Sequence, residues 1–575
     1  MTLANALQYG LFLVVVTAFV IPVGRYIARV FSGQKTILDP LLVPVERLIY
    51  RLSGTDPQHE MTWVEYATSF IVFSLVGTLA LYLILRIQPL FHTFDPAHRP
   101  SPLSPDLAMN TAISFSTTTT WQAYGGENAM SYFSQMAGLA AQNFLAGASG
   151  LAVGIAFIRG LGRQQVEGLG NFSVDLVRAT LWVLLPLSVI GSTLLIWQGV
   201  PMNFNAYTQA TTLSGSSQTI PQGPVAALEF IKNLGTNGGG FFNVNGAHPY
   251  ENPTPLTNFL EMLAIAVLPA ALTHTFGHMI GRPRQGWVLY GVMVTLFAVG
   301  LLIAHYAEQR GNPLFNQLGI VDQAQAETQA GGNMEGKETR FGIGGSILTA
   351  VTTSNGATGS YNSMHDSYMP IGGAVPLTNM LIGEVIFGGL GTGLYSMILV
   401  ALIAPFVGGQ MVGRTPQYLG KAISVTELKF IGLYTILGPA TVLLLTALAV
   451  VAEGGRAGLT TNTGAHGFTE IVFAYASSVA NNGQNFAGLS ANNPFYNITT
   501  AIAMMVGRFG LAIPALALAG TFAKQISRPL TTRTLRSDTF LFATLLLSTL
   551  IVVNAISYFP ILALGPIIEH LFLFR

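Results

Sequence analysis

The sequence has 575 residues, of which 50% are hydrophobic and only 9% are charged, and its formal net charge is +1. Soluble domains carry roughly 25% charged residues, so this chain lacks the polar coat that a water-exposed surface needs. The near-zero net charge argues against a nucleic-acid partner. The chain contains no cysteine, which excludes disulfides, thiolate metal ligands and a cysteine nucleophile.

Ten apolar stretches are long enough to cross a bilayer, because a hydrocarbon core of about 30 Å needs about 20 helical residues. They predict an all-α polytopic membrane protein. The first stretch has no basic start and no small-residue cleavage site, so we expect a retained span rather than a signal peptide. The expected transmembrane helices are 3–24, 62–87, 129–158, 174–198, 256–280, 286–306, 376–408, 427–452, 495–524 and 538–562.

Lysine and arginine are concentrated in alternate loops, and this predicts the orientation of the chain. Cytoplasmic loops carry an excess of these residues, so we expect the basic loops on the cytoplasmic side. An even number of spans then leaves both termini on the external side. The basic residues that decide the orientation are Arg25, Arg29, Lys35, Arg47, Arg51, Arg159, Arg163, Arg282, Arg284, Arg414, Lys421, Lys524, Arg528, Arg533 and Arg536.

Four of the opposite connections contain a semi-apolar stretch too short to span, followed at once by small polar residues. Aligning Thr120, Gly238, Gly356 and Gly483 gives separations of 118, 118 and 127 residues. Each unit consists of a span, a short re-entrant helix, a polar loop and a second span. Such periodicity predicts a repeat architecture. We call the polar segments filter loops 1 to 4; they are FSTTTTWQ (115–122), LGTNGGGF (234–241), TTSNGATG (352–359) and VANNGQNF (479–486).

The recurrence of these loops has a physical meaning. Non-helical backbone at membrane depth is tolerated only where it is buried in protein or lines a wet cavity. Four such loops around one axis can form rings of carbonyl oxygens that replace the hydration shell of a cation. Glycine reaches positive φ without steric cost, and each short helix directs its negative end toward the axis. One loop alone reads equally well as an interhelical turn, but four on one predicted side favour an ion filter.

We therefore expect four pseudo-symmetric repeats, each a helix, a pore loop and a helix, around one pore, with two extra helices. The repeats are expected at 62–172, 173–284, 285–425 and 426–536, flanked by an extra helix with a cytoplasmic loop at 1–61 and an extra helix at 537–575. The expected ligands of the ion are Thr118, Thr119, Thr120, Asn237, Gly238, Gly239, Asn355, Gly356, Ala357, Asn482, Gly483 and Gln484.

Longer motifs around these loops resemble one family. They are NLGTNGGGFFNVNGAHPYENP (233–253), MHDS (364–367), GEVIFGGLGTGLY (383–395), MVGRTPQYLGK (411–421) and ANNGQNFAGLSANNP (480–494). On these motifs the chain resembles, almost end to end, the potassium-binding A subunit of the Kdp potassium-transporting ATPase, a family that resembles potassium channels. The resemblance implies that K⁺ is the transported ion and that the chain lies among lipid in a bacterial plasma (inner) membrane.

The resemblance also implies partners. They are a P-type ATPase subunit (KdpB-like), a C subunit with one membrane helix (KdpC-like) and a small F subunit (KdpF-like). Filter loop 1 departs from the family pattern TNTNWQ, because Thr118 and Thr120 stand where the family has asparagine. Threonine keeps one oxygen but loses the amide donor, so we expect ion affinity or selectivity to differ while backbone coordination survives.

Three charged residues in or near the spans are further candidates. Arg508 lies mid-span, where a charge costs about 2.5–3.5 kcal/mol on insertion scales. The resemblance implies that it obstructs straight flow below the filter and diverts the ion sideways to the pump subunit; a structural ion pair is the alternative. The resemblance places Glu384 and Arg414 near the cytoplasmic side of the ion route or at the subunit contact. A plain salt bridge explains these two equally well.

The run GGLGTG (388–393) interrupts the seventh expected span. Each glycine costs about 1 kcal/mol relative to alanine in a helix, so we expect the span to break there. The resemblance implies a flexible gating loop beneath the filter, whereas close packing of small residues between helices is the alternative. The glycines concerned are Gly388, Gly389, Gly391 and Gly393.

The sequence holds no G-x-x-x-x-G-K-[ST] phosphate loop and no Asp-Lys-Thr-Gly phosphorylation motif. We therefore expect no nucleotide on this chain, and active transport would draw its energy from a partner or an ion gradient. One alternative is a self-sufficient Trk/Ktr-type transporter gated by a cytoplasmic nucleotide-binding ring. Another is a non-transporting membrane scaffold, which would not need four filter-like loops.

Overall fold

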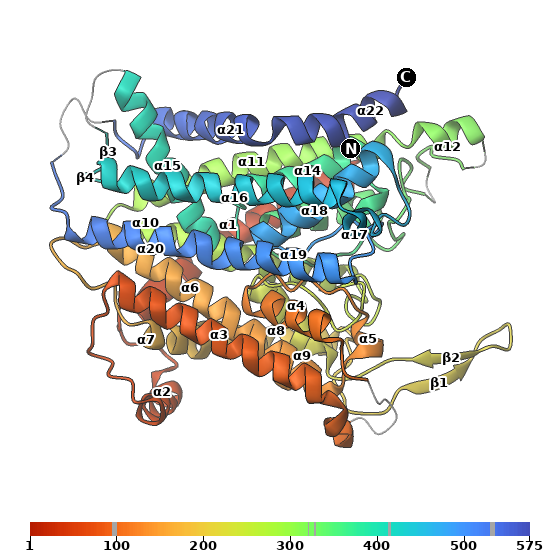
Figure 1. Cartoon of the computed structure of the whole chain (residues 1–575), viewed down its shortest axis with the longest axis horizontal. Coiled ribbons are helices and arrows are strands. Elements are labelled where there is room, and N and C mark those ends of the chain that lie inside the picture. Colours follow the sequence, from red (N-terminus) through yellow and green to blue (C-terminus); the bar gives the residue numbers. More distant parts are fainter. Residues whose placement is uncertain (95–100, 320, 327–328, 412–415, 530–534) are drawn as a thin grey trace.

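The computed structural model describes residues 1–94, 101–319, 321–326, 329–411, 416–529 and 535–575, and its long helices run side by side (Figure 1). Within these residues, ten helical segments are long and apolar enough to cross a membrane, which confirms the predicted number of spans. With η denoting 3₁₀ or π-helical turns, they are built from α1 (Leu3–Phe31), α3 (Trp63–Ile87), η2 and α6 (Ser134–Ala140, Ala141–Gly162), α7, η3 and α8 (Phe172–Arg178, Ala179–Leu184, Leu185–Trp197), α10 (Pro255–Met279), α11 (Pro283–Gln309), α15 (Thr392–Met411), α16 (Val425–Val451), α19, η5 and α20 (Pro494–Met505, Val506–Gly510, Leu511–Lys524) and α21 (Phe540–Leu562).

Polar capping residues fix where several long helices begin. The backbone N–H of Thr62, at the start of α3, donates to Glu65 Oε2 at 2.7 Å, and the side chain of Thr62 caps the helix in return. Ser424 and Glu427 form the same reciprocal pair at the start of α16. Such pairs satisfy N–H groups that a helix start leaves unpaired, so local sequence sets the ends of these spans.

Four shorter helices precede the filter loops: α4 (Pro105–Ser116), α9 (Val225–Leu234), α13 (Gly342–Asn355) and α18 (Gly464–Ala480). Each packs between two helices of its own repeat, namely α3 and α6, α8 and α10, α11 and α14 (Pro370–Leu381), or α16 and α19. In each repeat, the later of these two helices, which follows the filter loop, also contacts the short helix of the next repeat. These contacts join α6 with α9, α10 with α13, α14 with α18, and α19 with α4. Because the fourth repeat returns to the first, the repeats close into a circle.

The two extra helices pack against the second and third repeats. Helix α1 lies along α10 and contacts α13, and α21 contacts α11, α14 and α15. Both chain termini lie toward the same end of the bundle, and helix α2 (Asp39–Ser53) lies at the other end (Figure 1). The shared end of the two termini agrees with an even number of spans.

Two small antiparallel ribbons depart from the purely α-helical fold that the sequence predicted. The first pairs β1 (Thr208–Thr211) with β2 (Ser217–Ile220), and the second pairs β3 (Gln417–Tyr418) with β4 (Lys421–Ala422). The first ribbon is polar and exposed, so it lacks the alternation of apolar residues that marks a half-buried strand. The remaining short elements are η1 (Gln88–Phe94), α5 (Gly126–Ala129), α12 (Pro313–Leu318), η4 (His365–Ser367), α17 (Glu453–Arg456), η6 (Ala563–Ile567) and α22 (Ile568–Leu573).

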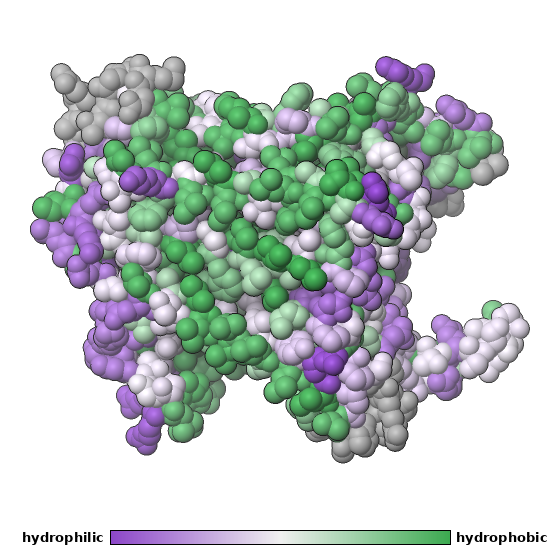
Figure 2. Space-filling model, in the orientation of Figure 1, coloured by the Kyte–Doolittle hydropathy of each residue, from purple (hydrophilic) through white to green (hydrophobic). Residues whose placement is uncertain are grey.

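The surface of the bundle is apolar where the helices run. Figure 2 shows hydrophobic residues over the middle of the visible face and hydrophilic residues gathered toward the two ends. Leu11, Leu79 and Leu444 are examples of exposed leucines on α1, α3 and α16. So much exposed apolar surface is a liability in water and matches the hydrocarbon of a bilayer.

A buried ion pair helps to hold the first and second repeats together. Arg159 donates to both carboxylate oxygens of Asp175, at 2.5 and 2.9 Å, and to the carbonyl of Phe31 at 3.0 Å. The hydroxyl of Tyr66 also donates to Asp175, at 3.0 Å. Removing one member of such a pair strands a buried charge at a cost of about 3–5 kcal/mol, so α1, α6 and α7 are firmly fixed to one another here.

Candidate functional site

Each filter loop leaves its short helix through one residue with left-handed backbone. Such backbone is uncommon outside glycine, so its recurrence in all four loops marks these residues as structural equivalents. No hydrogen bond of the described residues ends on their carbonyl oxygens, and all four residues line one cavity of about 10 Å³, the room of one water molecule. They form the inner ring of the site: Thr118 (φ 64°), Thr236 (51°), Ala357 (50°) and Asn481 (56°).

A second set of equivalents, the outer ring, lies two residues further along each loop. It consists of Thr120, Gly238, Gly359 and Gly483. The φ angle is 50° at Thr120, 94° at Gly238 and 88° at Gly483. Gly238 and Gly359 form a parallel bridge, in which the N–H of Gly239 donates to the carbonyl of Gly359 at 3.1 Å. Filter loops 2 and 3 are therefore joined backbone to backbone.

The remaining contacts close the outer ring. A Cβ built on Gly359 would lie 2.8 Å from the carbonyl carbon of Gly483, and one on Gly483 would lie 2.0 Å from the carbonyl oxygen of Thr119. The hydroxyl of Thr120 donates to the carbonyl of Asn237 at 2.6 Å. Each loop thus touches the next, and no side chain fits at the glycine positions.

The alignment of filter loop 3 that the sequence suggested is wrong by three residues. Helix α13 continues through Asn355, and Gly356 follows as its C-cap with φ −82°. A Cβ on Gly356 would lie 2.3 Å from Ile265 of α10 instead of meeting a neighbouring loop. Asn355 and Gly356 therefore lie outside the two rings. The equivalent pair is Thr358 and Gly359. Both pairs place a small polar residue directly before glycine, as loops 2 and 4 do, so residue type alone does not separate them.

Thr236 and Asn481 of the inner ring are not among the expected ligands, because the expected positions were counted from the glycines instead of from the ends of the short helices. Of the expected ligands, Thr118, Thr120, Gly238, Ala357 and Gly483 lie in the two rings. The amide of Asn482 donates to the carbonyls of residues 353 and 354, both at 3.2 Å, and so ties loop 4 to α13. The other expected residues, buried beside the rings, are Thr119, Asn237, Gly239 and Gln484.

Filter loop 2 is held from behind by the carboxylate of Glu251. Its Oε1 accepts hydrogen bonds from the backbone N–H groups of Phe241, at 2.7 Å, and Phe242, at 3.0 Å. Its Oε2 accepts from the N–H of Gly246 at 2.5 Å. Three backbone N–H groups thus converge on one buried side chain, which anchors the run of glycines and phenylalanines.

The rings lie between two spaces. The residues that follow the outer ring line a cavity of about 560 Å³ that all four repeats share; examples are Gln122, Asn243, Tyr361 and Asn485. The residues of the inner ring line the small cavity on the other side. The loops are thus a constriction between a wide outer vestibule and a narrow inner chamber.

Arg508 faces the inner chamber from the π-helical turn η5. Its side chain is 5% exposed. It donates to Thr118 Oγ1 at 3.2 Å, to the carbonyl of Ala146 at 2.9 Å and to Ser149 Oγ at 3.0 Å. No ion pair among the described residues includes Arg508. The centre of the Phe70 ring lies 5.5 Å from its guanidinium carbon. The buried positive charge is therefore held beneath the inner ring by neutral groups alone.

The seventh expected span is broken at residues 382–391, which overlaps the glycine run at 388–393 but begins before it. Helix α14 ends at Leu381 and α15 starts at Thr392. Gly391 has φ 89°, and a Cβ there would lie 2.1 Å from the carbonyl oxygen of Gly150 on α6. Gly389 lines the inner chamber, and a Cβ on Gly388 would collide with the backbone of residue 384. Gly393 packs directly against Gly388. The break therefore passes directly beneath the rings.

Glu384 also lines the inner chamber. Its Oε1 accepts a hydrogen bond from the amide of Asn482 at 2.7 Å, and its backbone is left-handed, with φ 52°. A carboxylate and a guanidinium, from Glu384 and Arg508, thus face one small space without pairing directly. Arg414 lies outside the described residues.

Comparison with known proteins agrees with this geometry. Residues 10–571 match the family described as the potassium-transporting ATPase A subunit. The chain belongs to this family. It is 50% identical over 575 residues to the potassium-transporting ATPase potassium-binding subunit of Granulibacter bethesdensis, covering 100% of this chain and 99% of that one. It is also 50% identical over 580 residues to the protein of the same name from Sorangium cellulosum, with 99% of both chains covered.

One solved structure shares the fold at much lower sequence similarity. The potassium transporter TrkH from Vibrio parahaemolyticus is 12% identical, and the match covers 91% of this chain and 100% of TrkH with a TM-score of 0.50. At that identity the likeness concerns the architecture alone. It agrees with four helix–loop–helix repeats around a common centre.

Proposed function

We propose that this chain is the potassium-binding and translocating subunit of an ATP-driven, high-affinity K⁺ importer. The observation that carries the proposal is the closed circle of four filter loops, with four unpaired carbonyl oxygens in its inner ring. Rings of backbone carbonyls can replace the hydration shell of K⁺. The relatives named as potassium-binding subunits support the same reading.

The ion enters from the external side of a bacterial inner membrane, through the vestibule of about 560 Å³. Both termini then lie outside, and the basic loops lie in the cytoplasm. The repeats proposed for this pore are 62–172, 173–284, 285–425 and 426–536, with 1–61 and 537–575 as additions. The outer ring of Thr120, Gly238, Gly359 and Gly483 and the inner ring below it supply the oxygens.

The ion leaves sideways instead of straight through. Arg508 places a positive charge under the inner ring, and the break at residues 382–391 covers the chamber from below. A cavity of about 100 Å³ starts at the same chamber wall, at Glu384 and Asn481, and reaches α16 and α21. We infer that K⁺ passes along this side toward a P-type ATPase partner of the KdpB type, with the glycine run as a gate and Glu384 attracting the ion. KdpC-like and KdpF-like subunits complete the assembly.

The test is to isolate the tagged chain from its native membranes and assay what accompanies it. We expect a membrane partner that forms an acid-stable, hydroxylamine-sensitive aspartyl phosphate, and ATP hydrolysis that rises with K⁺ and not with Na⁺. The same preparation after removal of the partner is the control and should lose hydrolysis, because we expect the nucleotide to bind to the partner.

The fold shared with TrkH suggests a second candidate function, that of a self-sufficient Trk/Ktr-type transporter. It predicts a soluble nucleotide-binding ring in place of the phosphorylated membrane partner. Isolation of such a ring, with K⁺-insensitive ATP hydrolysis, would contradict the importer proposal.

A further inference from the structure

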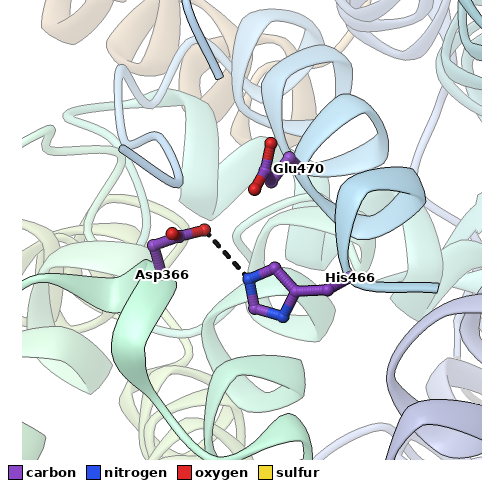
Figure 3. A group of neighbouring side chains, drawn as sticks. All are labelled: Asp366, His466 and Glu470. Atoms are coloured by element: carbon purple, nitrogen blue, oxygen red, sulfur yellow. Dashed lines mark hydrogen bonds and ion pairs between the residues drawn. The ribbon is translucent and has the colours of Figure 1, made fainter. Parts of the chain in front are cut away.

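A cluster of charged side chains lies near the vestibule but outside the two rings (Figure 3). Asp366 follows filter loop 3, His466 and Glu470 lie on α18, and Glu569 lies on α22. His466 Nε2 is 3.0 Å from Asp366 Oδ1, and His466 Nδ1 is 2.8 Å from Glu569 Oε1. Three segments that are far apart in the sequence thus meet at one imidazole.

The first argument is the donor set. One ligand atom each of Asp366, His466 and Glu470 lie within 4.8 Å of one another, and Figure 3 shows the Asp366 carboxylate joined to the imidazole, with the Glu470 carboxylate near both. An imidazole nitrogen and carboxylate oxygens are typical ligands of Zn²⁺ at about 2.0–2.2 Å. Three protein ligands with an open fourth position are a common arrangement for this ion.

The second argument is an unpaired buried oxygen. Glu470 is 0% exposed. Its Oε1 accepts a hydrogen bond from the amide of Asn462 at 2.9 Å, but its Oε2 has no hydrogen-bond partner. A buried carboxylate oxygen without a partner is costly. A cation between Glu470 and Asp366 would supply the missing partner.

The third argument is the balance of charge. Three carboxylates surround one imidazole, and no ion pair among the described residues brings a lysine or arginine to Asp366, Glu470 or Glu569. Even a protonated imidazole is a single cationic group among three carboxyl groups. A divalent cation that displaces this proton brings the cluster closer to neutrality.

The fourth argument is the support around these groups. With Nδ1–H of His466 donating to Glu569, the lone pair of Nε2 faces Asp366. A ligand atom of Glu470 lies within 4.8 Å of this pair. Histidine ligands of metals almost always donate their other N–H to a carboxylate or carbonyl in this way. The amide of Asn462 donates to Asp366 at 3.3 Å and to Glu470 at 2.9 Å, which holds both carboxylates in place.

We propose that Asp366, His466 and Glu470 bind one divalent transition-metal ion of the Zn²⁺ type, with Glu569 orienting the imidazole. The ion would tie the segment after filter loop 3 to α18 of the fourth repeat and to the C-terminal helix α22. It is distinct from the K⁺ of the rings, since its ligands are carboxylates and imidazole instead of backbone carbonyls.

The test is a titration of the purified full chain in detergent, after removal of any affinity tag, with Zn²⁺ by calorimetry and with Co²⁺ by visible absorption. We expect one ion per chain and a Co²⁺ spectrum typical of low coordination number. Glu470→Gln and His466→Asn should abolish both signals. Glu569→Gln keeps every ligand and should weaken binding about 10–100-fold, as changes to groups behind a ligand do.

The matched control is His59→Asn, which removes an exposed histidine that pairs with Glu65 at 3.6 Å on the surface. It should leave the stoichiometry and affinity of the wild type unchanged. Absence of stoichiometric binding to the wild type would overturn the proposal and leave the cluster as an ion-paired tie. Equal binding by the wild type and Glu569→Gln would overturn it as well, even if Glu470→Gln and His466→Asn failed to fold.

Discussion

Replacing Gly238 with alanine is expected to raise the K⁺ concentration for half-maximal ATP hydrolysis by the assembled complex about tenfold or more. Gly238 has φ 94°, and a Cβ there would lie 2.1 Å from the amide nitrogen of Gly359. Left-handed backbone at a residue other than glycine costs about 1–3 kcal/mol, and each 1.4 kcal/mol of lost binding is about tenfold in affinity. The added methyl group pushes filter loops 2 and 3 apart, so the ring oxygens no longer fit the dehydrated ion. A K⁺ titration of ATPase activity measures the effect.

Gly215→Ala is the matched control. Gly215 has φ 84° in the turn between β1 and β2, and a Cβ there would meet nothing within 4 Å. It therefore carries the same backbone strain without touching the rings, and it should leave K⁺ affinity unchanged. Gly483→Ala, whose Cβ would lie 2.0 Å from the carbonyl oxygen of Thr119, should act like Gly238→Ala. Unaltered affinity in both folded ring variants would refute the filter assignment.

Replacing Arg508 with glutamine is expected to uncouple ATP hydrolysis from K⁺ uptake and to open a passive leak. The guanidinium donates to Thr118 of the inner ring at 3.2 Å, so its charge lies directly below the ion site that we propose. Two like charges about 5 Å apart repel by about 3 kcal/mol at an effective dielectric constant of 20, which corresponds to about a hundredfold in rate. The leak is measured as Rb⁺ flux into proteoliposomes without ATP, and coupling as the ratio of K⁺ transported to ATP hydrolysed.

Arg508→Lys retains a positive charge at the same place and serves as the control, with little leak expected. Lysine loses the forked donor geometry, so some loss of turnover is compatible with the account. An Arg508→Gln complex with the wild-type coupling ratio and no Rb⁺ leak would show that the arginine is structural.

Much of the fold could be predicted because spanning a membrane requires long apolar runs, which are visible directly in the sequence. Each span is an apolar run of the required length, and the glycines between Gly388 and Gly393 mark the broken span for a local reason, their poor helix propensity. The four loops were found because small polar residues recur at similar spacing on one side of the membrane. The outer-ring residues of loops 1, 2 and 4 could be predicted from the same recurrence of small polar residues.

The errors arose where the outcome depends on packing in three dimensions. Loop 3 offers two similar pairs, Asn355–Gly356 and Thr358–Gly359, and the choice depends on how far α13 extends against α10. Thr236 and Asn481 were missed because their role follows from a left-handed φ and not from residue type. The group around His466 combines residues about 100 positions apart, which no local pattern can bring together.

The most direct test of the account is a structure of the assembled complex in which Rb⁺ replaces K⁺, with its position identified by anomalous scattering. The account predicts a peak on the axis of the circle, enclosed by carbonyl oxygens of Thr118, Thr236, Ala357 and Asn481 and of the outer ring above them. Rb⁺ peaks located elsewhere, with the centre of the four loops empty at saturating ion, would contradict it.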